Sequence, residues 1–62
     1  MLRYTDLAEA IRLARSAGMS TIQIVRALSG SLPYLEALQI ARQAAPLLGI
    51  SISEFMELRR NL

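Results

Sequence analysis

The segment Leu7–Gly30 constrains the fold of this chain more than any other part of the sequence. It reads LAEAIRLARSAGMSTIQIVRALSG and holds two short amphipathic patterns, one on each side of Ala17-Gly18-Met19-Ser20. In both patterns apolar residues recur at the three- and four-residue spacing of a helix. Glycine readily takes the left-handed conformation that ends a helix. The segment therefore predicts two helices joined by a tight turn.

The first of these helices is predicted from about Asp6 to Ala17. Thr5 or Asp6 is placed to cap it, and the acids Asp6 and Glu9 lie near the positive end of the helix dipole. Gly18 is expected to end the helix. The residues that share its buried stripe are predicted from helical spacing to be Leu7, Ala10, Ile11 and Ala14.

The second helix is predicted from about Thr21 to Leu28. Ser20 and Gln23 match the S-x-x-Q capping box, in which each residue bonds the backbone N–H of the other. The run Ile22–Val25 is rich in β-branched residues, which favour strands. The alternation of polar and apolar residues that a strand requires does not continue beyond this run, and the capping residues favour a helix. Its apolar face is predicted to comprise Ile22, Ile24, Val25 and Leu28.

The third helix is predicted from about Leu32 or Pro33 to Ala45, with Ser31 as its N-cap. Pro46 is expected to end or kink this helix, because a proline ring clashes with the preceding turn. The residues predicted to share its inner stripe are Tyr34, Ala37, Leu38, Ala41, Ala45 and Leu48.

The fourth helix is predicted from about Ile52 to Arg60, after a break at Gly49. Ser51 and Glu54 form a second capping box before it. Arg59 and Arg60 are interpreted as compensating the negative C-terminal end of the helix dipole. The residues predicted to face inward are Ile52, Phe55, Met56 and Leu62.

Length and composition limit the domain that these four helices can form. The chain of 62 residues makes a single domain, residues 1–62, and a domain of this size buries only about 60% of its unfolded surface. Hydrophobic residues nevertheless make up 53% of it. We therefore predict an all-α fold, a compact domain of about four short helices, whose apolar surplus forms a subunit interface, most simply that of a two-fold homodimer.

The composition also argues against several classes of function. The sequence has no cysteine and no histidine, which excludes disulfides, thiolate catalysis and the common zinc sites. Asp6 and Glu9 are interpreted as helix-start residues rather than as a catalytic carboxylate pair. We expect no enzyme activity, no cofactor, no metal and no membrane span. The first ten residues lack the apolar core of a secretory signal, so a cytoplasmic location is expected.

The net charge is +2, and all seven positive charges are arginines. Arginine suits bidentate contacts to phosphate and guanine. The segment AGMSTIQIVRALSG, residues 17–30, resembles helix-turn-helix DNA-binding domains. In one register it is similar to the LacI-type pattern A-G-x-S-x-x-x-[IV]-x-R-x-L-x-G. The residues that match are Ala17, Gly18, Ser20, Ile24, Arg26, Leu28 and Gly30.

This register implies that Ser20–Leu28 is the recognition helix, with Ser20, Thr21 and Arg26 facing DNA. The side chains predicted to contact DNA are Arg12, Arg15, Ser20, Thr21, Gln23 and Arg26. A simpler interpretation remains open for the arginines. Arg12 and Arg15 can pair with Glu9 or lie in water, and Arg26 can be an ordinary solvated side chain.

In a second register, residues 8–28 are similar to the first two helices of recombinase and Cro/CI-like domains. Leu47–Leu58 also resembles the closing helix of Cro/CI-like repressors. The second register makes Thr21–Leu28 the supporting helix and starts the recognition helix at Leu32. The DNA-facing residues would then be Leu32, Pro33, Tyr34 and Glu36, which are poor readers of bases and include a carboxylate.

From the sequence we predict a small dimeric helix-turn-helix transcriptional regulator that inserts a helix into the major groove of DNA. The alternative is a protein–protein interaction or oligomerisation module, such as a helical adaptor or an antiactivator, that keeps this shape without binding DNA. Under the alternative, a partner groove or dimer seam draws its solvent-facing members from Ile22, Ile24, Leu32, Leu35 and Leu58.

Overall fold

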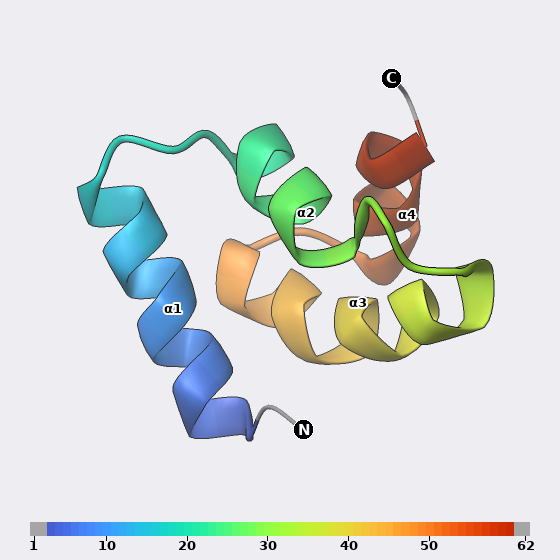
Figure 1. Cartoon of the computed structure of the whole chain (residues 1–62), viewed down its shortest axis with the longest axis horizontal. Helices are drawn as coiled ribbons and strands as arrows, with labels where there is room; N and C mark the ends of the chain where they lie inside the picture. The colour runs from blue at the N-terminus through green and yellow to red at the C-terminus, as the bar shows by residue number, and fades with distance from the viewer. Residues whose placement is uncertain (1–2, 61–62) are drawn as a thin grey trace.

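The computed structural model describes residues 3–60, and all regular secondary structure in that range is α-helical. Four helices follow one another along the chain: α1 (Tyr4–Ser16), α2 (Thr21–Ser29), α3 (Tyr34–Leu48) and α4 (Ile52–Arg60). They form a compact body with principal extents of 26 × 24 × 20 Å (Figure 1). The predicted all-α class and the four-helix count are confirmed.

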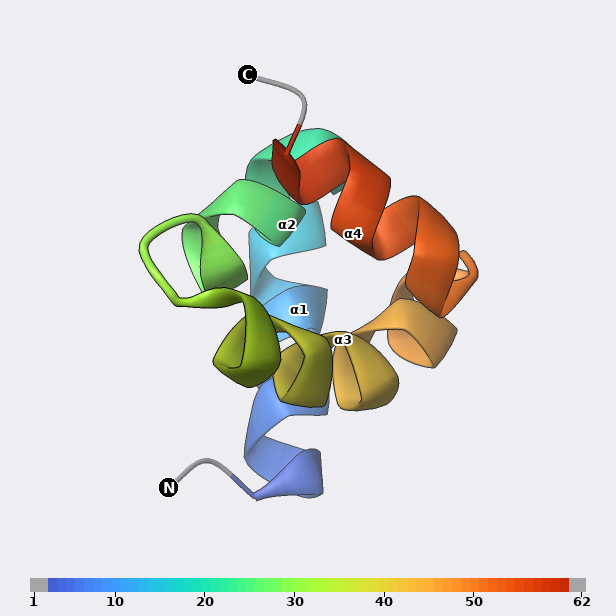
Figure 2. The same ribbon diagram turned by 90° about the vertical axis from the view of Figure 1, so that its right-hand side faces the viewer.

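Helix α3 lies at the centre of the packing. It contacts α4, α2 and α1, and α2 also packs against α4. The main helix contact of α1 is with α3. In Figure 2, α2, α3 and α4 surround a common centre and α1 lies behind them. The fold is therefore a three-helix unit with α1 attached to one side of α3.

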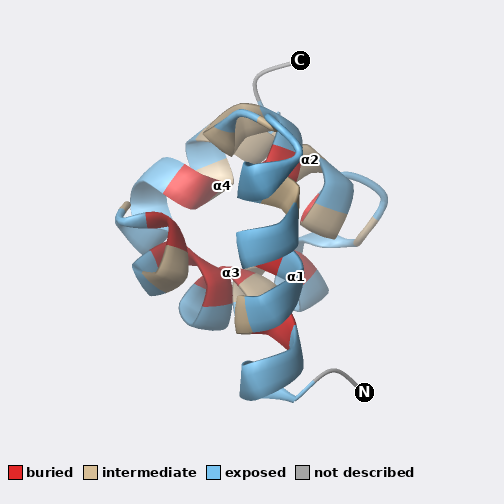
Figure 3. Cartoon of the chain, turned by 90° about the vertical axis from the view of Figure 1, so that its left-hand side faces the viewer, coloured by how far each residue is buried: buried red, intermediate tan, exposed pale blue. Residues whose placement is uncertain are grey.

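The hydrophobic core is small, and α3 contributes mainly alanines to it. The buried apolar residues are Leu7, Ile11, Ile24, Val25, Ala37, Ala41, Ala44, Ala45, Leu48 and Phe55. Figure 3 shows the buried positions, in red, on the inward sides of the helices. Phe55 of α4 is the largest side chain in this core that is fully enclosed.

Three residues predicted to lie inside are exposed. Ala10 lies on the surface of α1, Tyr34 is 61% exposed and Ile52 is 39% exposed. Tyr34 and Ile52 are the first residues of their helices, and they extend beyond the part of each helix that its neighbours cover. Helical spacing predicts which face of a helix is apolar, but not how far the neighbouring helices cover it. The predicted inward position of Leu62 lies outside the described residues.

The start of α1 differs from the prediction. The helix begins at Tyr4, and Arg3 stands at its N-cap without a side-chain capping bond. Leu7 N–H donates to the carbonyl of Arg3 at 3.0 Å. Thr5 and Asp6 therefore lie within the first turn, and the prediction that one of them caps the helix is wrong. Asp6 still places its carboxylate near the positive end of the dipole, where Arg3 Nε lies 3.6 Å from it.

The connections on either side of α2 follow the local sequence signals. Gly18 is left-handed, with a φ of 88°, and ends α1 as predicted. Ser20 Oγ accepts a hydrogen bond from Gln23 N–H at 3.2 Å, and Gln23 Oε1 accepts one from Ser20 N–H at 2.8 Å. This confirms the capping box. Helix α2 then ends at Ser29, one residue later than predicted.

Helix α3 starts at Tyr34, with Pro33 at its N-cap, and continues through Pro46 to Leu48. The predicted Ser31 cap and the predicted end near Ala45 are therefore wrong. Gly49 sets the end instead, because it adopts the left-handed conformation. In the last turn, Gly49 N–H donates to the Pro46 carbonyl at 3.2 Å, and Ile50 N–H donates to the Ala45 carbonyl at 3.1 Å. These bonds satisfy carbonyls that a helix end leaves open.

We expect Gly49→Ala to lower the free energy of unfolding by about 1 kcal/mol, because a residue with a Cβ is strained in the left-handed conformation. The φ of Gly49 is 74°, and a Cβ added there meets no heavy atom within 4 Å. The loss would therefore report backbone strain rather than a clash. Asparagine tolerates this conformation better, so Gly49→Asn should lose less. Urea denaturation followed by circular dichroism measures both variants, and equal stability of Gly49→Ala and wild type would contradict this account.

Helix α4 spans the predicted range. It starts after Ser51, whose Oγ accepts a hydrogen bond from Glu54 N–H at 3.0 Å. Of the predicted inward residues, Phe55 is buried and Met56 is half-buried. Within residues 3–60, no helix combines the length and the apolar character that crossing a bilayer requires.

Candidate functional site

The predicted DNA-contacting residues of the α1–α2 connection are bonded to one another. Arg15 Nη2 donates to Thr21 Oγ1 at 2.7 Å, which links the last turn of α1 to the first turn of α2. Ser20 and Gln23 use their side chains in the capping box described above. The structure thus brings Arg15, Ser20, Thr21 and Gln23 together, but in the role of fixing this connection.

Arg12 forms a two-bond contact with Glu9 on the exposed side of α1. Its Nη2 lies 2.6 Å from Glu9 Oε2, and its Nε lies 3.1 Å from Glu9 Oε1. The hydrogen bonds, and then the charge, of Arg12 lower the pKa of Glu9, and Glu9 raises the pKa of Arg12 by the same contacts. Both groups are therefore held in their charged forms. This confirms the simpler interpretation of Arg12 as the partner of Glu9.

Arg26 lies on α2 and is half-buried. Its Nε atom has no contact with solvent. Arg26 therefore differs from an ordinary solvated arginine, and part of its guanidinium is unavailable to a ligand approaching from outside.

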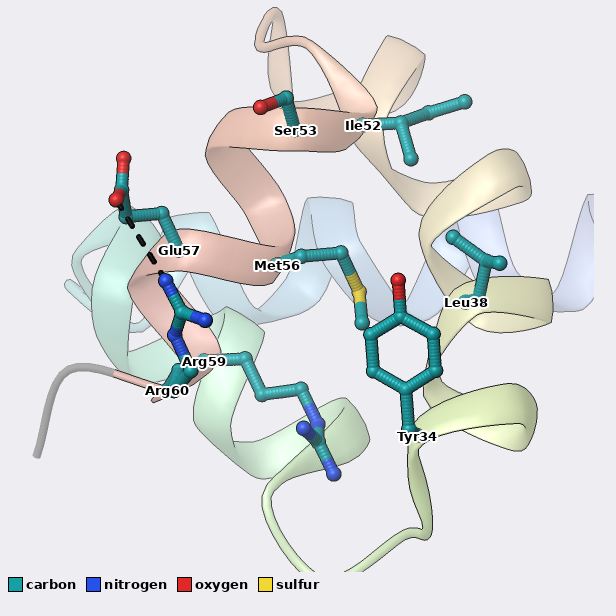
Figure 4. Close-up of a pocket in the computed structure, with 8 residues that line it drawn as sticks. All are labelled: Tyr34, Leu38, Ile52, Ser53, Met56, Glu57, Arg59 and Arg60. Atoms are coloured by element: carbon teal, nitrogen blue, oxygen red, sulfur yellow. Dashed lines mark ion pairs between the residues drawn. The ribbon is translucent and has the colours of Figure 1, made fainter.

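A surface pocket of about 430 Å³ lies between α4 and the N-terminal half of α3 (Figure 4). Its apolar lining comes from Tyr34, Leu38, Ile52 and Met56. In Figure 4, the side chain of Met56 points from α4 toward the ring of Tyr34 on α3. The polar residues of the lining, all on α4, are Ser53, Glu57, Arg59 and Arg60. We call this feature the α3–α4 groove.

Exposed apolar side chains gather around this groove. Tyr34 and Ile52 line it, and Leu35, which follows Tyr34 on α3, is 71% exposed. Two other large exposed hydrophobic residues of the described range, Tyr4 and Leu13, belong to α1. Sequence reasoning missed the groove because it placed Tyr34 and Ile52 in the core. The signal that could have located it is the pair of apolar residues at the start of α3.

The residues offered from sequence for a partner surface have different environments. Leu35 is exposed as that hypothesis requires, whereas Ile24 is buried in the core. The other three, Ile22, Leu32 and Leu58, are half-buried. Leu35 is therefore the member of this set that is positioned to contact a partner.

Arg59 closes one end of the groove by holding the α2–α3 connection. Its Nε donates to the carbonyl of Ser29 at 3.1 Å, and its Nη2 donates to the carbonyl of Leu32. Its neighbour Arg60 is exposed and lies 3.9 Å from a carboxylate oxygen of Glu57. The sequence interpretation treats both arginines as compensating the dipole of their own helix. It does not include the contact that Arg59 makes with the end of α2.

In residues 3–60, no three His, Cys, Asp or Glu side chains are grouped so that they could hold a metal ion. Comparison with protein-family models, with curated proteins and with solved structures finds no match for this chain.

Proposed function

We propose that this protein is a small helical protein–protein interaction module that binds its partner through the α3–α4 groove and Leu35. The observation that carries the proposal is that the exposed Tyr34 and Ile52 line the groove, and that the exposed Leu35 follows Tyr34 directly in the first turn of α3. Exposed apolar residues gathered at one place, with polar residues at the edge, are typical of interaction sites. Part of the high apolar content of the chain is exposed at this surface.

The chemistry of the groove suits a protein partner. Leucine, isoleucine, tyrosine and methionine supply large apolar contacts, and aromatic residues and methionine are enriched at protein interfaces. The groove has polar groups along one side only, on α4. This is the arrangement of an apolar contact surface with a polar rim. The proposal assigns no catalytic role and no cofactor to any residue.

A helix-turn-helix DNA-binding regulator is the other hypothesis, and the geometry gives it less support. The LacI-type register would use α1 and α2, which the bond between Arg15 and Thr21 links. The second register would use α2 and α3, which pack against each other. DNA would then meet Tyr34, Leu35 and Glu36 at the start of α3. Two of these side chains have little to offer base edges, and the carboxylate of Glu36 repels phosphates.

A photo-crosslinking amino acid at position 35 tests the proposal. We expect it to crosslink the protein, in the cells that make it, to one discrete polypeptide. Gln43 provides a matched control, because it is exposed on the same helix, lies eight residues further along, which is about 12 Å, and does not line the groove. The same amino acid at position 43 should give no such product.

Two outcomes would contradict the proposal. The first is an equal crosslinking pattern from positions 35 and 43, or no product from either. The second is binding to mixed duplex DNA that weakens steeply with added salt, measured by fluorescence anisotropy, because salt sensitivity is the signature of phosphate contacts. That result would favour the DNA-binding hypothesis.

A further inference from the structure

We propose that the occupant of the α3–α4 groove is a second copy of this chain, related to the first by a two-fold axis. This inference rests on the proposed function and names the partner. It goes beyond the apolar surface, because it depends on charged groups at the edge of the groove.

The charged edge of the groove is complementary to itself. Glu57 and Arg60 lie one helical turn apart on α4, and their side chains are 72% and 79% exposed. In a two-fold dimer, every contact between two different residues occurs twice, because each copy supplies each residue once. A two-fold axis beside α4 can therefore place Glu57 of each copy opposite Arg60 of the other copy. This arrangement forms two contacts between opposite charges.

The same edge does not match a strongly charged partner. Glu57 and Arg60 carry opposite charges, and Arg59 adds a positive charge whose Nε and Nη2 already donate to two backbone carbonyls. A basic partner segment would therefore be repelled by the two arginines, and an acidic one would be repelled by Glu57. A second copy avoids this mismatch because it presents the same pair in reverse order.

The apolar residues are also arranged for mutual coverage. Leu35 is exposed, follows Tyr34 on α3, and is not among the residues that line the groove. In a two-fold dimer, Leu35 of each copy can pack against the apolar lining of the other. A stable interface buries about 800 Å² on each partner, roughly a fifth of the 4237 Å² surface of this protein. Burial on that scale would supply stability that a core of this size cannot supply alone.

Charge reversal tests this inference through the mass measured by sedimentation equilibrium. The wild type should be a dimer. Glu57→Arg places two arginines opposite each other at both contacts, and Arg60→Glu places two glutamates there. Each variant alone should dimerise at least about tenfold more weakly, because like charges across an interface are unfavourable. Both residues are exposed, so circular dichroism should show unchanged helix content.

The two variants also serve as controls for each other. An equal mixture of Glu57→Arg and Arg60→Glu restores both opposite-charge contacts, and it should form a heterodimer about as tightly as the wild type dimerises. The double variant Glu57→Arg, Arg60→Glu should recover the homodimer. A general loss of stability would not be rescued in either case, so rescue distinguishes a lost interface from a damaged fold.

Several results would overturn the inference. They are a wild type that stays monomeric at its highest soluble concentration, single reversals that dimerise like the wild type, or a mixture that does not associate. A monomeric wild type that crosslinks from position 35 to a different polypeptide would remove the second copy as partner and keep the proposed function. A monomer that gives no product from position 35 would remove both.

Discussion

Phe55→Ala is expected to remove a large part of the stability of this protein. Phe55 is fully buried in the core where α4 packs against α2 and α3. Truncating a buried phenylalanine to alanine costs about 3–5 kcal/mol, because apolar contacts are lost and a cavity remains. A domain of 62 residues has about 3–9 kcal/mol of stability in total. The loss is therefore a large share of the total, and the variant should unfold at a much lower urea concentration than the wild type.

Urea denaturation followed by circular dichroism measures this effect, with Leu13→Ala as the matched control. Leu13 is also a large apolar residue in a helix, but it is 54% exposed on α1. Its truncation should change the free energy of unfolding by no more than about 0.5 kcal/mol. Similar unfolding midpoints for the two variants would show that Phe55 does not occupy the core as described.

Arg59→Ala is expected to have the second-largest effect, a loss of about 2 kcal/mol. Hydrogen bonds from a charged donor contribute about 1.5–3 kcal/mol each, and partial exposure of this side chain reduces that value. The substitution leaves the carbonyls of Ser29 and Leu32 without the donors that Arg59 supplies. It also removes a positive charge from the C-terminal end of α2, where the helix dipole is negative.

Two variants separate the contact of Arg59 from its charge. Arg60→Ala removes the neighbouring charge, which belongs to an exposed ion pair, and should cost less than about 1 kcal/mol. Arg59→Lys keeps the charge but loses the planar fork of donors that reaches both carbonyls, so it should recover only part of the loss. Equal urea midpoints for Arg59→Ala and Arg60→Ala would refute this role for Arg59.

Features that depend on neighbouring residues were predictable from sequence. Gly18 ends α1, and the serine caps before α2 and α4 place the starts of both helices at the expected residues. In each case the groups that form the bonds lie within five residues of one another. The link between Arg12 and Glu9 belongs to the same category, because residues three apart in a helix are neighbours.

Features that depend on distant residues were not predictable. The partners of Arg59 lie 27 and 30 residues away, and no pattern near Arg59 indicates them. The exposure of Tyr34 depends on where α2 and α4 end in space. The α3–α4 groove depends on how these helices are placed relative to one another. Of the exposed apolar residues near the start of α3, only Leu35 is predicted from sequence to contact a protein partner.

The packing of α1 mainly against one helix, α3, has a consequence for how the protein opens. Leu7 and Ile11 are the buried residues of α1, and α3 is the helix on which it mainly packs. Regions with few buried contacts detach at a lower free energy than the whole protein unfolds, and their amide hydrogens exchange earlier. Figure 1 shows α1 beside the C-terminal half of α3, away from the Tyr34 end. Transient release of α1 would thus leave the opposite end of α3 and its groove in place.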